Sequence, residues 1–177
     1  MTQSDEMSTN VPKKISKRGY AGRSAEQLMQ ERRQRLMDTA LELFGTVGYV
    51  PTTVEKICSH AKVTTRHFYE HFKDREALLM AIFDTILQET RQQVLAEIVM
   101  SDLPLEQRFV GAVNAFLTSH LDDPRRAKIT TQEILGVSQR VEAHRNVLIT
   151  EFALLIESYL TLLVAEGKLP ARKCRIL

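Results

Sequence analysis

Two short amphipathic segments joined by a tight turn constrain the fold more than any other feature of this sequence. The segment Thr52-Thr53-Val54-Glu55 matches a capping box, with Thr52 as the N-cap and Glu55 at the third helical position. Thr64 is the next N-cap candidate. The spacing predicts one helix to about His60, a turn over residues 61–63 and a second helix over residues 65–72. Two short helices joined in this way form a helix-turn-helix unit, whose second helix can enter the major groove of DNA.

Apolar residues at helical spacing flank this unit on both sides. A helix from about Ser24 carries one such stripe, and Gly48 follows its last apolar position, where a left-handed C-cap is expected. Asp74 caps a longer helix after the unit. Further helices are predicted over residues 104–119, from residue 124 to about 135, and over residues 138–166. The apolar positions of the first helix are Leu36, Ala40, Leu43, Phe44 and Val47.

The sequence therefore predicts an all-α fold. An N-terminal three-helix DNA-binding domain over residues 24–90 precedes a helical ligand-binding and dimerisation domain over residues 91–177, which is short for that role. With seven Gly, five Pro and no Trp, the chain has little of the turn-rich composition of a sheet protein. Residues 1–23 contain five Lys and Arg among small polar residues, so we expect a flexible basic arm. The arm either contacts DNA phosphates or is a solvated tail.

Charge, cysteine content and hydropathy indicate a cytoplasmic protein. Residues 1–75 carry 13 Lys and Arg against 9 Asp and Glu, whereas residues 76–177 carry 11 against 13, which permits contact of the first part with a polyanion. No apolar run approaches the roughly 20 residues that span a bilayer, and the N-terminus has no apolar segment of a secretory signal. Cys58 and Cys174 form no disulfide framework, so a reduced compartment and no membrane contact are expected.

Residues 32–83 resemble the N-terminal domain of TetR-family repressors, without a gap. The resemblance implies a sequence-specific transcription regulator, a repressor released by a small-molecule effector, and neither an enzyme nor a protein with a cofactor or metal. It also implies a homodimer on a near-palindromic operator, with the second short helix reading the major groove. The residues that carry the resemblance are Ala40, Leu43, Phe44, Gly48, Tyr49, 52–54, Ile57, Ala61, Val63, Thr64, Phe68, Tyr69, 71–73 and 76–79.

The resemblance assigns DNA-contact roles position by position. Thr65, Arg66 and His67 occupy the exposed start of the reading helix and are candidates for contact with base edges, where Arg66 suits guanine. Tyr69, His71 and Lys73 match positions that contact phosphate in the family. The remaining candidates are hydroxyl or backbone N–H donors to phosphate, for which capping alone is the alternative: Thr52, Thr53 and Thr64.

An effector site is expected between the helices of the second domain, because six side chains lie on helices that line the pocket in similar proteins. The three aromatic members could equally be core, and the three polar members could equally be solvated or bonded between helices. We expect a mostly apolar pocket with a few polar groups. The six residues are Phe116, His120, Gln132, Glu133, Phe152 and Tyr159.

Two features depart from the family pattern. Lys62 stands in the turn where the family usually has Gly, and a residue other than Gly in the left-handed region costs roughly 1 kcal/mol. After Gly167 only residues 168–177 remain, too few for the two further helices that usually form the family's dimer interface. Either the chain is truncated, or its dimer is weak or built differently.

Two rival hypotheses remain open. The pentapeptide His67-Phe68-Tyr69-Glu70-His71 spells the inverted zinc-peptidase motif, and two His four residues apart on a helix can bind Zn²⁺, with Cys58 and His60 near in sequence. A helical interaction protein without DNA binding is the second hypothesis. It predicts no salt-dependent affinity for DNA, whereas a DNA-binding protein loses affinity steeply as salt rises.

Overall fold

The computed structural model describes residues 24–99 and 102–170, and every regular element in these ranges is helical. The predicted basic arm and Cys174 lie outside the described residues. The all-α fold class predicted from the sequence is confirmed. The elements in chain order are α1 (Ala25–Thr46), α2 (Val54–Ala61), α3 (Thr65–His71), α4 (Arg75–Val99), α5 (Leu105–Leu121), α6 (Pro124–Lys128), the π-helix η2 (Ile129–Glu133) and α7 (Gln139–Ala165).

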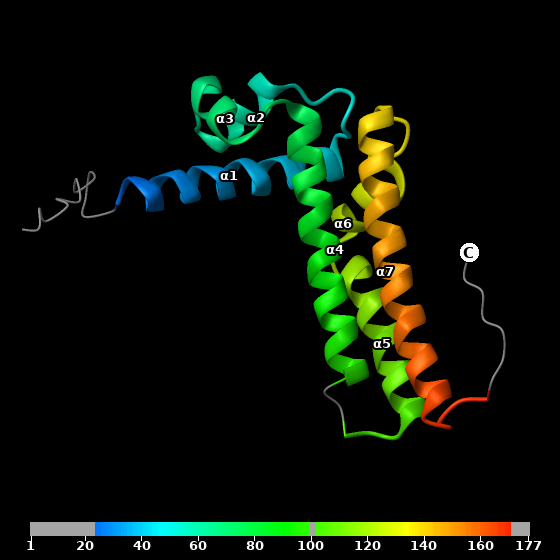
Figure 1. The fold of residues 1–177 in the computed structure, drawn as a ribbon. Helices are drawn as coiled ribbons and strands as arrows, with labels where there is room; N and C mark the ends of the chain where they lie inside the picture. Colours follow the sequence, from blue (N-terminus) through cyan, green and yellow to red (C-terminus); the bar gives the residue numbers. More distant parts are fainter. Residues whose placement is uncertain (1–23, 100–101, 171–177) are drawn as a thin grey trace, which may run out of the picture.

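Helices α1, α2 and α3 form a head, and α4, α5 and α7 form a helical bundle. Helix α4 belongs to both parts. Figure 1 shows α1 lying across one end of the molecule, with α2 and α3 packed on it, while α4 runs from this head down beside α5 and α7. The larger core cluster joins the parts, because Phe44 and Phe68 of the head are fully buried in the same cluster as Ile134 and Val141. The smaller cluster lies further along α4 and α5 and consists of Val94, Ile98 and Ala112, with Ala115, Phe152 and Tyr159 against it.

Capping residues set most helix boundaries, as expected. Ser24 and Gln27 form a reciprocal capping box at α1, and the Ser138 hydroxyl accepts from the N–H of Val141 at α7. Asp74 accepts from the N–H of Ala77 at 2.7 Å, which caps α4 as predicted. The N-cap of α2 is a correction, because Thr53 and not Thr52 accepts a backbone N–H there, from Lys56.

Helix α7 is more apolar than the described chain can bury. Its most apolar 18-residue window has a mean hydropathy of 1.9, and only 6% of that window is buried. It is long and apolar enough to cross a bilayer, the one such helix in residues 24–99 and 102–170, although length and composition alone are weak evidence. Glu151 and Glu157 interrupt this stretch, so it contains no continuous apolar run of that length, although its mean hydropathy reaches that of a membrane span.

Candidate nucleic-acid interface and ligand cavity

The turn between α2 and α3 is fixed by backbone hydrogen bonds. Lys62 adopts φ 56° and ψ 40°, the left-handed conformation that the family pattern assigns to Gly. The N–H of Val63 then reaches the carbonyl of Cys58 at 3.0 Å, which closes the end of α2. Thr64 caps α3 by accepting from the N–H of His67. The predicted turn and the second N-cap are therefore confirmed.

One side of α3 is packed in the core, and the opposite side is exposed to solvent. Phe68 is fully buried, and its ring packs against Phe72 at 5.8 Å between centroids. Thr65 is exposed, the Arg66 side chain is 89% exposed and Tyr69 is 59% exposed. The Arg66 guanidinium approaches Glu70 at 3.6 Å, an exposed pair of little energetic weight, so it can leave this carboxylate for another acceptor.

The two histidines of α3 differ in their access to a ligand. The Nδ1 of His67 lies 3.0 Å from the hydroxyl of Thr64, which orients the ring at the start of the helix. His71 is half-buried, and its enclosed Nε2 has no hydrogen-bond partner among the residues that the structure describes. Burial, and next the nearby Arg33 charge, lower the pKa of His71, so the ring is neutral at neutral pH. Contact of its Nε2 with phosphate requires the ring to turn.

The threonines expected at phosphate separate into two groups. Thr52 is fully buried, its hydroxyl donates to the carbonyl of Gly48 at 2.7 Å and its N–H donates to Tyr49 at 3.2 Å. Its side chain and N–H are therefore unavailable to DNA, which corrects the expectation. Thr53 and Thr64 are exposed beside the N-termini of α2 and α3.

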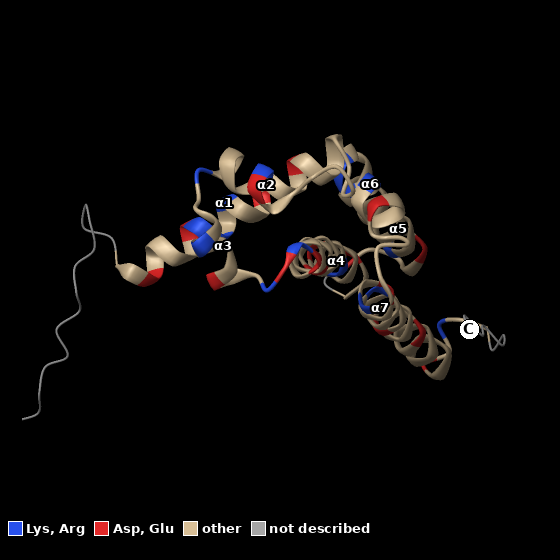
Figure 2. Ribbon diagram, turned by 90° about the horizontal axis from the view of Figure 1, so that it is seen from above, with Lys and Arg blue, Asp and Glu red and all other residues tan. Residues whose placement is uncertain are grey.

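Basic side chains lie at both ends of the reading unit. Lys73 is exposed in the loop between α3 and α4, next to the Asp74 cap. Figure 2 shows Lys and Arg on α3 and in this loop. Helix N-termini and exposed cations together are suited to bind phosphate.

An apolar cavity of about 310 Å³ lies between α4, α5 and α7. Of the six residues expected at the effector site, Phe116 and Phe152 line it. Tyr159 packs on the adjacent core cluster, and its hydroxyl donates to the carbonyl of Ile98 at 3.1 Å. The cavity lining consists entirely of apolar side chains: Val94, Ile98, Phe109, Ala112, Val113, Phe116, Phe152 and Ile156.

The three polar residues expected at the effector site lie outside this cavity. Glu133 accepts from the backbone N–H of Tyr49 at 2.7 Å, so it contacts the head instead. Gln132 is exposed on η2. The Nδ1 of His120 lies 2.8 Å from the Ser119 hydroxyl on its own helix. Their observed environments match the alternative left open for them by the sequence, that of solvated side chains or of polar contacts between elements.

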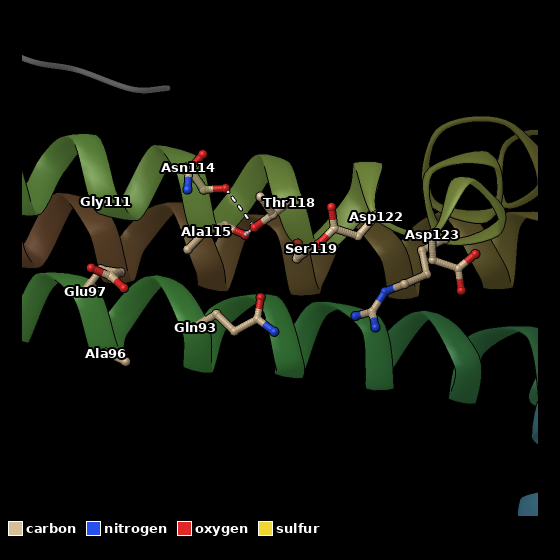
Figure 3. A pocket seen from close by; sticks show the side chains of 11 residues that line it. Gln93, Ala96, Glu97, Gly111, Asn114, Ala115, Thr118, Ser119, Asp122 and Asp123 are labelled. Atoms are coloured by element: carbon tan, nitrogen blue, oxygen red, sulfur yellow. Dashed lines mark hydrogen bonds between the residues drawn. The ribbon is translucent and has the colours of Figure 1, made fainter.

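A second, polar groove of about 670 Å³ lies between α4 and α5 and contains none of the predicted site residues. Figure 3 shows Gln93 and Glu97 of α4 facing Asn114 and Thr118 of α5. The Thr118 hydroxyl donates to the carbonyl of Asn114 at 3.0 Å. Small residues at Ala96, Gly111 and Ala115 leave room between the helices, and this spacing was the sequence signal for the groove.

The zinc hypothesis finds no support in the geometry of the described residues. Within residues 24–99 and 102–170, no group of three or more His, Cys, Asp or Glu side chains is arranged to hold a metal ion. Cys58 is buried, and burial raises the pKa of its thiol, which disfavours the thiolate that binds zinc.

The part of this chain that matches a known protein family lies in the head. Residues 36–82 match the sequence profile of bacterial regulatory proteins of the tetR family. The HTH-type transcriptional regulator HbdR of Aromatoleum sp. (strain CIB) is 33% identical over 89 residues, which are 50% of this chain and 38% of HbdR. The HTH-type transcriptional regulator YhgD of Bacillus subtilis (strain 168) is 30% identical over 119 residues, 63% of this chain and 62% of YhgD. The chain thus spans less than two thirds of these relatives.

Solved structures extend the likeness to the whole fold. The fatty acid degradation regulator FadR of Bacillus halodurans superposes with a TM-score of 0.70 at 18% identity, over 78% of this chain and 71% of FadR. The transcriptional regulator FadR of Bacillus subtilis, solved in complex with stearoyl-CoA, gives a TM-score of 0.69 at 18% identity, over 77% of this chain and 73% of that chain. At this identity the likeness shows a shared fold.

Proposed function

We propose that this chain, whose residues 36–82 match the tetR family of bacterial regulatory proteins, is a cytoplasmic, sequence-specific DNA-binding regulator of that family. The observation that carries the proposal is α3, which is anchored by the buried Phe68 while the Arg66 side chain is 89% exposed. A rigid helix with one free polar face has the form of a major-groove reader. Two copies would place α3 in successive major grooves of a near-palindromic site.

The exposed side chains divide into two roles. Thr65, Arg66 and His67 would contact base edges, since they lie at the start of α3. Arg66 would donate to guanine, a bidentate contact worth roughly 1–3 kcal/mol of discrimination. Residues beside the helix ends would contact phosphate and fix the register of the helix on DNA. They are Thr53, Thr64, Tyr69 and Lys73.

The cavity between α4, α5 and α7 would hold the effector, whose binding releases the DNA. Its volume of about 310 Å³ lies at the small end of the range for ligand sites, and its lining is apolar. We therefore propose an apolar or amphipathic effector. The stearoyl-CoA in the FadR complex of Bacillus subtilis, an amphipathic ligand, supports this choice of chemistry.

Selection from a random double-stranded DNA pool tests the proposed function, with the molar mass measured by light scattering on the same sample. A palindrome enriched by a dimer supports it. Absence of enrichment from a dimeric sample contradicts it.

Two substitutions then separate base reading from phosphate contact on the selected duplex. Arg66→Ala should relax the preference at one base position by roughly 1–3 kcal/mol. Lys73→Ala should weaken binding to all sequences equally and reduce the salt slope by about one. Arg91→Ala, an exposed cation on α4 away from α3, is the control and should bind as the wild type does. A changed base preference in Lys73→Ala would reverse the assigned roles.

A further inference from the structure

The segment from Glu133 to Arg140, here called the strap, joins η2 to α7 and contacts the DNA-binding head at two points. One point is Tyr49, just before α2, and the other is Asp74, just after α3. The strap therefore reaches the residues that flank the reading unit on both sides, although it belongs to the second domain.

The first contact is made by a carboxylate. Oε2 of Glu133 accepts the backbone N–H of Tyr49 at 2.7 Å, and Oε1 lies 3.5 Å from Nζ of Lys128. Gly48 has φ +104°, and a Cβ at this position would lie 3.3 Å from the same carboxylate. Glycine thus provides both the left-handed backbone and the close approach that this contact needs.

The second contact is a bidentate ion pair between Arg140 and Asp74. The two terminal nitrogens of Arg140 donate to the two carboxylate oxygens of Asp74 at 3.0 and 2.7 Å, and one of them also lies 2.9 Å from Glu76. The Ser138 hydroxyl donates to the same Glu76 oxygen at 3.0 Å. A bidentate pair fixes direction as well as distance. The start of α7 is thereby held against the start of α4.

Arg75 joins the two contact points to each other. Its guanidinium donates to the carbonyls of Tyr49 and Val50 at 3.1 and 3.3 Å and to that of Thr52, and it lies 4.1 Å from the centroid of the Tyr49 ring. These bonds connect the loop before α2 to the first turn of α4. The strap contacts this connected region from the second domain.

We propose that Glu133 and Arg140 are positioning residues for DNA recognition, through which α7 sets the orientation of the reading unit. The inference rests on the proposed function. Arg140 and the cavity residue Phe152 lie on the same helix, 12 residues and roughly 18 Å apart. A ligand in the cavity that displaced α7 would therefore also displace Arg140 relative to Asp74.

Hydrogen–deuterium exchange on the full chain tests the contacts without any ligand. Glu133→Ala and Arg140→Ala should raise exchange in peptides covering residues 47–53 and 72–77 by about tenfold, because each removes a hydrogen bond with a charged partner. Glu133→Gln should stay near the wild type, since an amide oxygen still accepts from Tyr49. The matched control is Asp84→Ala, which removes the 2.6 Å contact with His144 between the same two helices further from the head.

Affinity for the selected duplex supplies the functional readout. Glu133→Ala and Arg140→Ala should bind it about tenfold more weakly with an unchanged salt slope, because no phosphate contact is removed. Exchange at the head in the Glu133→Ala and Arg140→Ala variants equal to that in Asp84→Ala would overturn the inference, as would raised exchange with unchanged affinity. If the wild type selects no duplex while exchange at the head rises, the contacts stand and the proposed function fails instead.

Discussion

Substitution of Gly45 tests how closely the head packs on the second domain. A Cβ built on Gly45 would lie 2.4 Å from Cβ and 2.8 Å from Cα of Arg125 on α6. Neither atom can rotate away, so α1 and α6 must separate by about 1 Å, and overpacking of this kind costs about 1–3 kcal/mol. Alanine gains about 1 kcal/mol over glycine within a helix. The balance is a net loss of up to about 2 kcal/mol in Gly45→Ala, centred at about 1 kcal/mol.

Equilibrium unfolding in urea measures this difference, and a second glycine supplies the control. A Cβ on Gly111 would lie 2.6 Å from Oε2 of Glu97, the far end of a flexible side chain that can turn aside. Gly111→Ala should therefore unfold within about 1 kcal/mol of the wild type, on the stable side. The reasoning is refuted if Gly45→Ala is as stable as the wild type or loses no more than Gly111→Ala.

Three further substitutions test the turn, the strap and the cavity. Lys62→Gly should raise the free energy of unfolding by about 1 kcal/mol in urea, while Lys62→Ala should not, since Lys62 has φ 56°. The hydrogen bond from Arg140 lowers the pKa of Asp74, so the stability from this contact is present above the ordinary carboxyl pKa and is lost as pH falls through the folded-state value. Asp74→Asn keeps the cap and should flatten the acid-side decline in urea unfolding below about pH 5; an unchanged decline would contradict this. Val113→Trp should fill the cavity and reduce the fluorescence of bound 1-anilinonaphthalene-8-sulfonate, and unaltered binding would place the dye elsewhere.

Local chemistry was sufficient to predict the helices of the head. Thr64 and Asp74 were readable as caps because each has a side-chain acceptor directly before an apolar periodic segment. The sequence around α2 did not show whether Thr52 or Thr53 is its N-cap. Both threonines precede α2, and the burial of Thr52 against Gly48 decides which hydroxyl is left to cap the helix.

The exposed face of α3 was also predictable, whereas the contacts that hold it were not. Phe68 and Phe72 mark the buried side by their spacing, which leaves Thr65 and Arg66 on the other side. Asp74 and Arg140 are 66 residues apart, and no periodicity relates them. Such pairs depend on how α7 returns along α4, which the sequence pattern does not specify.

The position of Glu133 has a geometric cause in η2. An α-helical period projected through residues 124–135 assigns each side chain to a face by 100° per residue, but η2 is a π-helix with a wider turn. The extra residue shifts the register of every side chain after it. Glu133 is thereby found against Tyr49 of the head, while Phe116 of α5 and Phe152 of α7 line the cavity. π-turns are frequent at functional sites, and η2 presents the Glu133 carboxylate that contacts the head.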